Sequence, residues 1–552
     1  MRRLLWILCF CVCIFPAGAV QITEFCPDPY LAEDTDEYLV LAGDGSLDGI
    51  TVSDGKEGFR FPSGSSIHGT VTVARESAAF RASHGYLPDY ELVDISDVPD
   101  VVNGKTLRMA NTRDCLMVYE NGNLIQKVSW PEDVKPREGQ VHYLQDGIWD
   151  PRPLMIGQSR FFPASFDNVT VTTFVSPDCS QNVFTSVVAG ARSDLLVNVY
   201  EFTSTDMSDA LIFARENGTR VTVLLEGGPV GGISPGEKSA IWRMNQSGIP
   251  VYQMGAATGE HAPYRYDHAK YVVVDNRAVL LTSENFKNSG FPPAGTSGNR
   301  GWGVYMEDPR LAAYFSTVYA SDLAGPAIHP IAGTDGPTET TTRAAYTQKF
   351  TPAVFSGAIV TPVISPDTSD QIIHMIDSAQ GTIEIEQAYI TNESKTRLNP
   401  YLAAAVNASR RGVSVRVLLD SYWFNTEDEA DNDEMAALIN HIASTENLPL
   451  EARCADLDAS GIEKIHNKGV IVDDRAVLVS SINWNTNSPN FNREAGVIIE
   501  HPGAAKYFRE VFDDDWRPAV RSSQPSLDYL KIACVIVVIG LLLILYYRRH
   551  VR

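Results

Sequence analysis

The apolar and polar positions of this chain follow one pattern twice. The run from Gly218 to Glu226 is largely apolar and ends in a carboxylate, and Gly412 to Asp420 repeats it. Ser176-Pro177-Asp178 likewise returns as Ser365-Pro366-Asp367 ahead of each run. Apolar runs of this length are typical of fully buried strands, and helical stretches separate them. The pattern predicts two copies of an α/β unit, with further strands at Leu195 to Tyr200 and Ile383 to Tyr389.

The chain ahead of the first copy has a different pattern, made of short strands and frequent turns. Glu37 to Leu41 and Thr70 to Ala74 fit strands, and Asp44-Gly45 and Asn121-Gly122 are turn signals. No long helical period interrupts this region. Residues 20–135 are therefore expected to form an all-β sandwich.

Two stretches that are poor in apolar residues separate these units. Residues 136–165 are rich in Pro, Gly and Asp, and residues 331–350 include the run Thr338-Glu-Thr-Thr-Thr342. Both are predicted to be linkers, because such compositions bury too little apolar surface to pack. The predicted fold class is α/β, with a duplicated α/β/α sandwich whose repeats span residues 166–330 and 351–520.

The N-terminal end has the pattern of a secretory signal. Arg2 and Arg3 precede an apolar run from Leu4 to Phe15, and Ala17-Gly18-Ala19 fits a cleavage site. Residues 1–19 are therefore predicted to be a signal peptide. An uncleaved anchor is the alternative.

The C-terminal end has the pattern of a membrane anchor. The chain is apolar without interruption from Ile532 to Tyr547, with Lys531 before this run and arginines after it. Lys531 can extend its charge to the interface, which lengthens the apolar segment. We expect a single transmembrane helix at residues 529–547 and a basic cytoplasmic tail at 548–552, with the globular body outside the cytoplasm. A buried core helix is the alternative.

Charge and cysteines limit the possible partners. The formal net charge is −23 at pH 7, which repels polyanions at long range and disfavours a broad nucleic-acid-binding face, although it allows a local basic pocket. Cys26, Cys115, Cys179 and Cys454 lie between the predicted signal peptide and the predicted membrane helix, outside the cytoplasm, where disulfides are allowed. A Cys26–Cys115 bridge is preferred because both residues fall in one predicted domain. No Cys/His cluster indicates zinc.

The candidate chemistry lies late in each repeat. A His-x-Lys pair opens an apolar run that ends in Asp, and a Ser and an Asn follow at matched distances. These residues are His268, Lys270, Asp275, Ser283 and Asn285 in the first repeat, and His466, Lys468, Asp473, Ser481 and Asn483 in the second. A lone His-x-Lys pair is more often a packed or surface pair than a site. Two full copies inside a wider duplication indicate one shared site.

These copies resemble the paired motif of the phospholipase D superfamily, over roughly Val169 to Trp516. The resemblance implies a nearly symmetric site in which one His attacks phosphorus and forms a covalent phosphohistidine. The other His would protonate the leaving oxygen and then activate water. A neutral imidazole is a good nucleophile and titrates near working pH, so His suits both roles. By analogy with two-repeat members, His268 is expected to be the nucleophile and His466 the acid.

The other residues of the motif would stabilise charge. Lys270 and Lys468 supply positive charge for the phosphoryl oxygens, and Asn285 and Asn483 donate hydrogen bonds to the same group. No metal or other cofactor is expected, and the resemblance also implies metal independence. Four further residues are expected to support the site rather than to react: Asp275, Ser283, Asp473 and Ser481.

The first copy departs from the family pattern at one position. Family repeats often carry a Glu that orients the His, and the second copy has Glu494, whereas the first has Gly301 at the equivalent place. Glu494 is expected to hold the ring of His466. The candidates for holding the ring of His268 are Glu201 and Glu226.

The N-terminal domain resembles the lamin-tail type of immunoglobulin-like domain. The resemblance rests on Ile22 to Phe25, Glu37 to Leu41 and Thr106 to Asn111. It implies binding or spacing rather than catalysis.

The sequence thus predicts a membrane-anchored, extracytoplasmic phosphodiesterase. The tether and the acidic surface slightly favour phospholipid head groups as the substrate. An extracellular, metal-independent nuclease is an alternative, because sites of the superfamily take either kind of diester. A non-catalytic surface binding protein is a further alternative, favoured only by Gly301.

Overall fold

The computed structural model describes residues 20–93, 95–96, 98–130, 137–145, 147–150, 152–255, 261–325, 327–338, 342–426 and 431–517. The predicted signal peptide (1–19), membrane helix (529–547) and basic tail (548–552) lie outside these residues. Within the described ranges, no helix combines the length and the apolar character needed to cross a bilayer.

The N-terminal domain is built from two β-sheets. One sheet has the order β10-β9-β1-β2-β5-β6 and the other β4-β3-β7-β8. Their bounds are β1 Gln21–Cys26, β2 Tyr38–Ser46, β3 Ile50–Ser53, β4 Gly58–Arg60, β5 Ser66–Ala74, β6 Tyr90–Glu91, β7 Asp114–Glu120, β8 Asn123–Trp130, β9 His142–Gln145 and β10 Ile148–Trp149. Side chains of both sheets, such as Leu41 and Leu116, share one core. This arrangement agrees with the predicted β-sandwich, and a short helix, α1 (Ser77–His84), packs through Phe80 against Cys26 and Tyr38 of the first sheet.

The segment predicted as the first linker, 136–165, belongs partly to this domain. Its strand β9 pairs with β1, and β10 pairs with β9, so the first sheet gains two strands. Trp149 of β10 packs edge-on against Phe25 in the core. Short strands of this kind are missed when turn residues dominate the composition. Only the part from residue 152 onward connects the domain to the repeats.

The preferred Cys26–Cys115 bridge is wrong. All four cysteines among the described residues are free. Cys26 is buried in β1 of the first sheet, whereas Cys115 lies in β7 of the second sheet, where its Sγ donates to the carbonyl of Asp54. Membership of one domain did not bring the two side chains together.

The two repeats share one continuous sheet. Its order is β18-β14-β13-β12-β15-β16-β17-β11 in repeat 1, followed by β19-β25-β24-β23-β20-β21-β22 in repeat 2. The repeats join where β11 (Phe166–Ser176) pairs antiparallel with β19 (Ala353–Ser365). The other bounds are β12 Asp194–Val199, β13 Arg220–Glu226, β14 Val251–Met254, β15 Lys270–Val274, β16 Ala278–Thr282, β17 Gly301–Glu307, β18 Ile328–Pro330, β20 Thr382–Gln387, β21 Ser414–Leu419, β22 Leu450–Cys454, β23 Lys468–Val472, β24 Ala476–Ser480 and β25 Glu494–Glu500.

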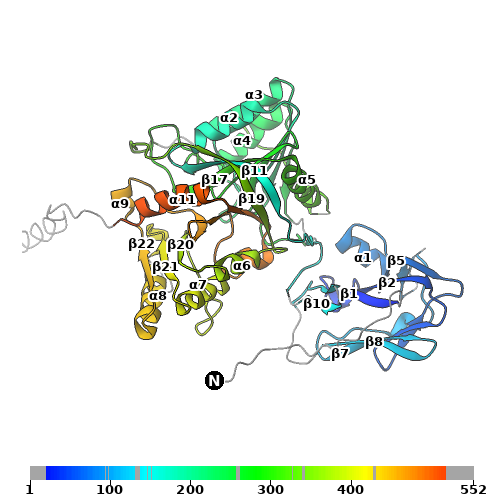
Figure 1. Ribbon diagram of the computed structural model, residues 1–552. Coiled ribbons are helices and arrows are strands. Elements are labelled where there is room, and N and C mark those ends of the chain that lie inside the picture. The colour runs from blue at the N-terminus through cyan, green and yellow to red at the C-terminus, as the bar shows by residue number, and fades with distance from the viewer. Residues whose placement is uncertain are drawn as a thin grey trace, which may run out of the picture.

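Helices cover both faces of each half of the sheet. Figure 1 shows α2 (Ser180–Gly190), α3 (Thr205–Glu216) and α4 (Pro235–Gln246) together over repeat 1. The helices α6 (Gln371–Asp377), α7 (Pro400–Arg410) and α8 (Asn432–Glu446) cover repeat 2. On the inner side, α5 (Pro309–Leu323) and α11 (Pro502–Asp515) contribute to one core with strands of both repeats, where Trp302 stacks on Phe508. The duplicated α/β/α architecture is therefore present.

A buried arginine in each repeat ties the two halves together. Arg300 forms ion pairs with Asp178 of its own repeat at 2.8 Å and with Asp515 of α11 at 2.6 Å. Arg493 forms the equivalent pairs with Asp367 at 3.2 Å and with Asp322 of α5 at 2.8 Å. Both guanidinium groups are fully buried. The Asp residues of the two Ser-Pro-Asp copies thus serve as their partners, and the second partner always comes from the other repeat.

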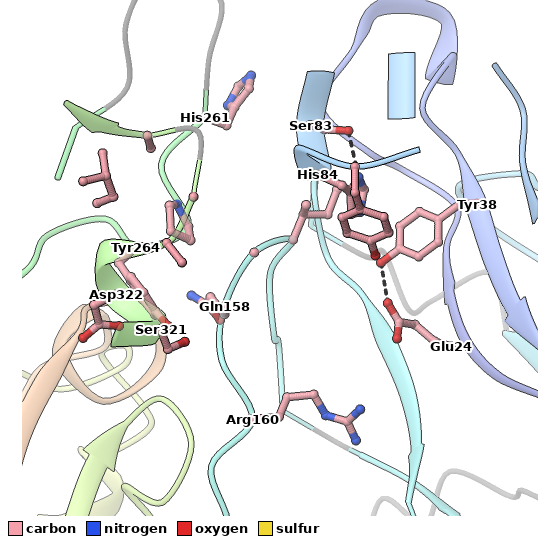
Figure 2. A pocket seen from close by; sticks show the side chains of 18 of the residues that line it. Glu24, Tyr38, Ser83, His84, Gln158, Arg160, His261, Tyr264, Ser321 and Asp322 are labelled. Carbon is pink, nitrogen blue, oxygen red and sulfur yellow. Dashed lines mark hydrogen bonds between the residues drawn. The ribbon is translucent and has the colours of Figure 1, made fainter. Parts of the chain in front are cut away.

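We call the buried ion pairs of Arg300 and Arg493 the lock. The segment after β10 connects the N-terminal domain to them. Ser159 Oγ accepts from Arg493 at 2.6 Å and donates to Asp367 at 2.7 Å. Beside it, a cavity of about 380 Å³ separates the domain from repeat 1. Figure 2 shows Glu24 and Tyr38 of the domain on one side of this cavity and Tyr264 and Asp322 of repeat 1 on the other. The segment that connects the N-terminal domain to the repeats therefore contacts the lock.

Replacing Asp515 by Ala should strongly destabilise the repeats. The change leaves the buried Arg300 without two of its charged hydrogen bonds, and breaking one side of a buried pair costs about 3 kcal/mol or more. The measurement is the free energy of unfolding in urea. Asp167→Ala, which removes an exposed partner of Arg310, is the control and should change it by less than about 1 kcal/mol. Equal effects of the two variants would contradict the role of the lock.

Candidate active site

Both histidines lie at the same edge of the sheet. Lys270 of β15 pairs with Val199, the last residue of β12, so His268 sits just beyond the carboxyl end of β12. Lys468 of β23 pairs with Gln387 at the end of β20, which places His466 equivalently. The two parallel strand pairs, β12–β13 and β20–β21, thus end at this site in both repeats.

The backbone of each histidine is held by the opposite repeat. The amide of His268 donates to the carbonyl of Arg493 at 2.8 Å, and the amide of His466 donates to the carbonyl of Arg300 at 2.9 Å. These are the two arginines of the buried lock. The backbone position of each histidine is therefore tied to the ion pairs that join the repeats.

The ring of each histidine also faces a carboxylate of the opposite repeat. Nδ1 of His268 hydrogen-bonds Oε2 of Glu494 at 2.8 Å, and Nδ1 of His466 lies 3.3 Å from Oε2 of Glu284. The expectation that Glu494 holds His466 is therefore wrong. Strand β25, which begins with Glu494, packs against β15 of repeat 1, so this carboxylate contacts the histidine of the other repeat. Only the first pair has the alignment of a hydrogen bond; the second is a contact without that alignment.

Gly301 makes room for Glu284, which the sequence analysis missed as an orienting residue. A Cβ at position 301 would lie 2.4 Å from Cγ and Oε1 of Glu284. Repeat 2 has the reverse arrangement, with Glu494 at the matching place and Ile482 in the Ser-x-Asn segment where repeat 1 has Glu284. Each repeat thus has one such glutamate, in the Ser-x-Asn segment of repeat 1 and after the Asn-Arg pair of repeat 2. The sequence feature that could have identified Glu284 was a charged residue between the two motif residues Ser283 and Asn285.

Polar neighbours hold the two carboxylates. Ser481 Oγ donates to Glu494 at 2.6 Å, Asn492 Nδ2 donates at 3.0 Å, and Ser488 Oγ donates as well. Glu284 accepts from Nδ2 of Asn299, the counterpart of Asn492, at 3.0 Å. In repeat 1 the motif serine, Ser283, instead accepts from the amide of Trp302. Glu494 thus has the fuller set of donors.

These contacts give the carboxylates opposite electrostatics. Burial alone would raise the pKa of Glu494, but His268, Lys270 and the hydrogen bonds lower it below its usual value. Burial raises the pKa of Glu284, and Asn299 and Lys468 only partly offset this. Glu494 is therefore held as a carboxylate, so Nδ1 of His268 carries the proton and Nε2 is free.

Both imidazoles favour the neutral form in the absence of an anion. Burial lowers the pKa of His268, and Glu494 partly compensates. Burial lowers the pKa of His466 further, since Lys468, Lys464 and Lys270 add repulsion. A bound anion would oppose that repulsion and return a proton to His466.

The two lysines converge on the same space. Nζ of Lys270 donates to the carbonyl of His268, and Nζ of Lys468 donates to the carbonyl of His466, both at 2.6 Å. Burial lowers the pKa of Lys270 to about 8. Burial and the charge of Lys270 lower the pKa of Lys468 well below its usual value. Two crowded, desolvated ammonium groups form a site that gains from an anion between them.

The motif asparagines lie beside the histidines with different partners. Asn285 Nδ2 donates to Glu201 at 2.8 Å, and Lys287 forms an ion pair with the same carboxylate. Both Asn285 and Asn483 are nine-tenths buried, and their Oδ1 atoms have no partner among the described residues. Glu201 therefore supports Asn285 and Lys287 and does not hold the ring of His268.

Glu226 acts on the backbone rather than on a ring. Its Oε2 accepts from the amide of Asp267, the residue before His268, at 2.6 Å. Asp420 does the same in repeat 2, where Oδ1 accepts from the amide of Ile465 at 2.7 Å. The carboxylates that end the two repeated apolar runs thus fix the backbone that leads into each histidine.

Asp275 and Asp473 lie at the far ends of β15 and β23, away from the histidines. Asp275 accepts from the amides of Arg192, Ser193 and Asp194, which lower its pKa. Asp473 accepts from the equivalent amides of residues 380–382. The structure gives both a local structural role in the loops that enter β12 and β20.

The geometry therefore brings two imidazoles and two lysines together around one space. Two imidazoles face one space from opposite repeats, and two lysines supply charge between them. Among the described residues, no group of three or more His, Cys, Asp or Glu side chains is arranged to hold a metal ion. An anionic group with a displaceable oxygen fits this set of side chains.

Anion binding should weaken as the pH rises. Lys270 binds an anion as an ammonium group, and its pKa of about 8 means that it loses this charge above that pH. Calorimetric affinity for sulfate, whose charge is constant from about pH 6.5 to 9.5, should fall by roughly tenfold per unit above about pH 8. Lys270→Arg should reduce this decline, since Arg stays charged and only Lys468 then loses its charge as the pH rises. An affinity independent of pH in the unmodified protein would contradict the assignment.

Comparison with known proteins places this site in a family. The family model described as "Cardiolipin synthase, PLD-like domain" matches residues 185–323 and 372–516, together just over half of the chain. A comparison with curated proteins gave no match.

Similar solved structures were also found. The phospholipase D family member Nuc from Salmonella typhimurium is 21% identical, with 30% of this chain and 99% of that chain covered and a TM-score of 0.26. The phosphatidylserine synthase of Haemophilus influenzae is 11% identical, with 62% and 85% covered and a TM-score of 0.44. The family match alone carries the assignment: the chain belongs to the phospholipase D superfamily, through two copies of the cardiolipin-synthase-type domain.

Proposed function

We propose that this protein is a phosphodiesterase that cleaves a phospholipid head group through a covalent phosphohistidine on His268. The observation that carries the proposal is the crossed pair of imidazole–carboxylate contacts, His268 with Glu494 and His466 with Glu284, around two buried lysines. Such a set supplies a nucleophile, an acid and charge stabilisation from this chain's own side chains.

The first step forms the intermediate. Nε2 of His268 attacks phosphorus, the bond from phosphorus to the leaving oxygen breaks, and His466 gives its proton to that oxygen. Glu494 stabilises the positive charge that develops on the attacking ring, because it is ionised and bonded to Nδ1. This favours His268 over His466 as the nucleophile, since Glu284 contacts His466 less directly.

The second step releases the product. His466, now neutral, takes a proton from water as the water oxygen attacks phosphorus, and the bond between phosphorus and Nε2 of His268 breaks. His268 returns as a neutral imidazole and His466 as the protonated acid. Lys270 and Lys468 remain paired with the phosphoryl oxygens through both steps.

The lipid preference and the location are part of the proposal. A net charge of −23 repels a nucleic-acid polyanion. The apolar run at residues 532–547 would tether the site to a bilayer, with the signal sequence placing the body outside the cytoplasm. The N-terminal sandwich, with its lamin-tail resemblance, would serve as a binding or spacing module.

Gly301 does not support the alternative of a non-catalytic protein. That reading rested on a missing glutamate in repeat 1, and Glu284 fills the space that this glycine leaves. Both imidazoles therefore have a carboxylate neighbour.

Turnover should survive EDTA and depend on both histidines. The full-length protein is assayed with excess EDTA on phosphatidylcholine vesicles, single-stranded DNA and a soluble aryl phosphodiester. His268→Ala and His466→Ala should each lower turnover by at least about 100-fold, as expected for loss of a nucleophile or a positioned acid. A phosphorylated peptide trapped from acid-quenched enzyme should map to His268. An adduct on His466 would reverse the roles, and faster cleavage of DNA than of lipid would replace the substrate.

The exchanged carboxylate can be tested by moving it back. Glu284→Ile should lower turnover of the aryl diester by roughly 10- to 100-fold, because His466 loses its orienting partner. Combining Glu284→Ile with Gly301→Glu copies the Ile482 and Glu494 arrangement of repeat 2 and should recover most of the loss.

Gly301→Ala is the matched control for this pair. Its Cβ would displace Glu284, so activity should fall although no functional group is removed. If Glu284→Ile leaves turnover and its pH profile unchanged, Glu284 is only a packing residue.

A further inference from the structure

The most exposed apolar segment of the repeats lies at the edge that carries the histidines. Tyr422, Trp423 and Phe424 are 39%, 57% and 69% exposed, and the described residues hold no other run of three consecutive large apolar side chains with such exposure. Trp423 and Phe424 lie in a short 3₁₀ turn, Trp423–Asn425, that follows β21, and Tyr422 immediately precedes it. None of the residues of this turn is buried. We call these three residues the aromatic tip.

The aromatic tip is anchored to the catalytic backbone. Asn425, at its end, donates from Nδ2 to Oδ2 of Asp420 at 2.8 Å. The other oxygen of Asp420 accepts from the amide of Ile465, next to His466. The rings themselves pack only loosely, with centroids 5.8 and 6.1 Å apart along the turn. The exposed rings of the aromatic tip are therefore attached to a backbone that hydrogen bonds hold in place at the rim of the site.

Repeat 1 carries a counterpart at the same edge. The loop after β13 exposes Val230 at 78%. The amide of Val230 donates to Tyr200 Oη at 2.8 Å, and the ring of Tyr200 packs against His268 with centroids 4.7 Å apart. Each repeat thus exposes apolar side chains at the rim. In repeat 1, Tyr200 links Val230 to the ring of His268. In repeat 2, Asp420 links the aromatic tip to the backbone before His466.

The described chain ends near the same edge. Trp516, just after α11, accepts through its carbonyl from Arg453 of β22, and Arg453 lies over its ring. The residues that follow β22, including α9 (Leu457–Ser460), line a hollow together with Tyr422 and Trp423. Figure 1 shows the end of α11 beside α9. The described chain therefore ends beside β22, whose last residue, Cys454, lines the hollow with Tyr422 and Trp423.

We infer that the aromatic tip and Val230 dock on the surface of a zwitterionic bilayer and hold the site against it. Aromatic rings suit the interface between head groups and acyl chains. Asp456 and Asp458 line the hollow, and the chain after the tip continues with Glu427, Asp428 and Glu429 in the sequence. This negative charge disfavours both anionic lipid and nucleic acid as the occupant.

The docking inference rests on the proposed lipid function but has its own test. Full-length protein is reconstituted in phosphatidylcholine vesicles, and turnover of the bilayer lipid and of a soluble aryl diester is measured in the same preparation. The double variant Trp423→Asn with Phe424→Asn should lose about tenfold or more on bilayer lipid, the expected effect of removing buried aromatic surface. Its turnover of the soluble diester should stay within about twofold.

Matched variants separate docking from general loss of apolar surface. Phe213→Asn removes a ring that is 60% exposed on α3, away from the histidine edge, and should change neither turnover. Trp423→Tyr with Phe424→Leu keeps interfacial character and should retain most of the bilayer activity. A double Asn variant that cleaves bilayer lipid as fast as the unmodified protein would overturn the inference.

A readout without turnover keeps the two proposals distinguishable. Brominated phosphatidylcholine should quench the fluorescence of Trp423, seen as the difference between the unmodified protein and Trp423→Tyr. Quenching without lipid cleavage would preserve docking and overturn the lipid substrate. Absence of quenching would overturn docking whatever the substrate. Loss of single-stranded DNA binding in the double Asn variant would instead identify the tip as a base-stacking surface.

Discussion

Two buried arginines connect the fold of this protein to its chemistry. Each guanidinium is fully buried and forms ion pairs with one aspartate from its own repeat and one from the end of a helix in the other. The carbonyl of the same residue accepts the amide of the opposite histidine. Buried charges are costly unless fully paired, so this arrangement strongly disfavours any relative shift of the repeats. The two imidazoles are thereby held in a single geometry.

The site is symmetric in its backbone and asymmetric in its side chains. Both histidines occupy equivalent places, yet Glu494 has several hydrogen-bond donors and a lowered pKa, whereas Glu284 has fewer and a raised one. The nucleophile and the acid that we propose need different electrostatics although they are the same residue type. The exchange of a carboxylate between positions 284 and 301 creates this difference without changing the backbone.

Access to the site follows from the same topology. The parallel strands β12, β13, β20 and β21 all end at the histidine edge, so the loops after β13 and β21 form its rim. Loops at such an edge are free to vary while the core is not. Here they expose apolar side chains, while the N-terminal sandwich contacts the lock through the segment around Ser159. The exposed rim and the contact with the connecting segment therefore involve different residues of the repeats.

The sequence alone determined the local features of this protein. Repeated apolar runs predicted the strands, and the duplicated His-x-Lys motif predicted a shared site, because periodicity and spacing are properties of neighbouring residues. Tertiary structure alone decided which carboxylate faces which imidazole. Glu494 follows the His466 motif in the sequence but contacts His268, since the two halves of the sheet face each other. The contact of Glu284 with His466 could be recognised only in the structure, where Glu284 occupies the space that a side chain at position 301 would fill. The free state of Cys26 and Cys115 likewise depended on their lying in different sheets, a long-range property that no local pattern encodes.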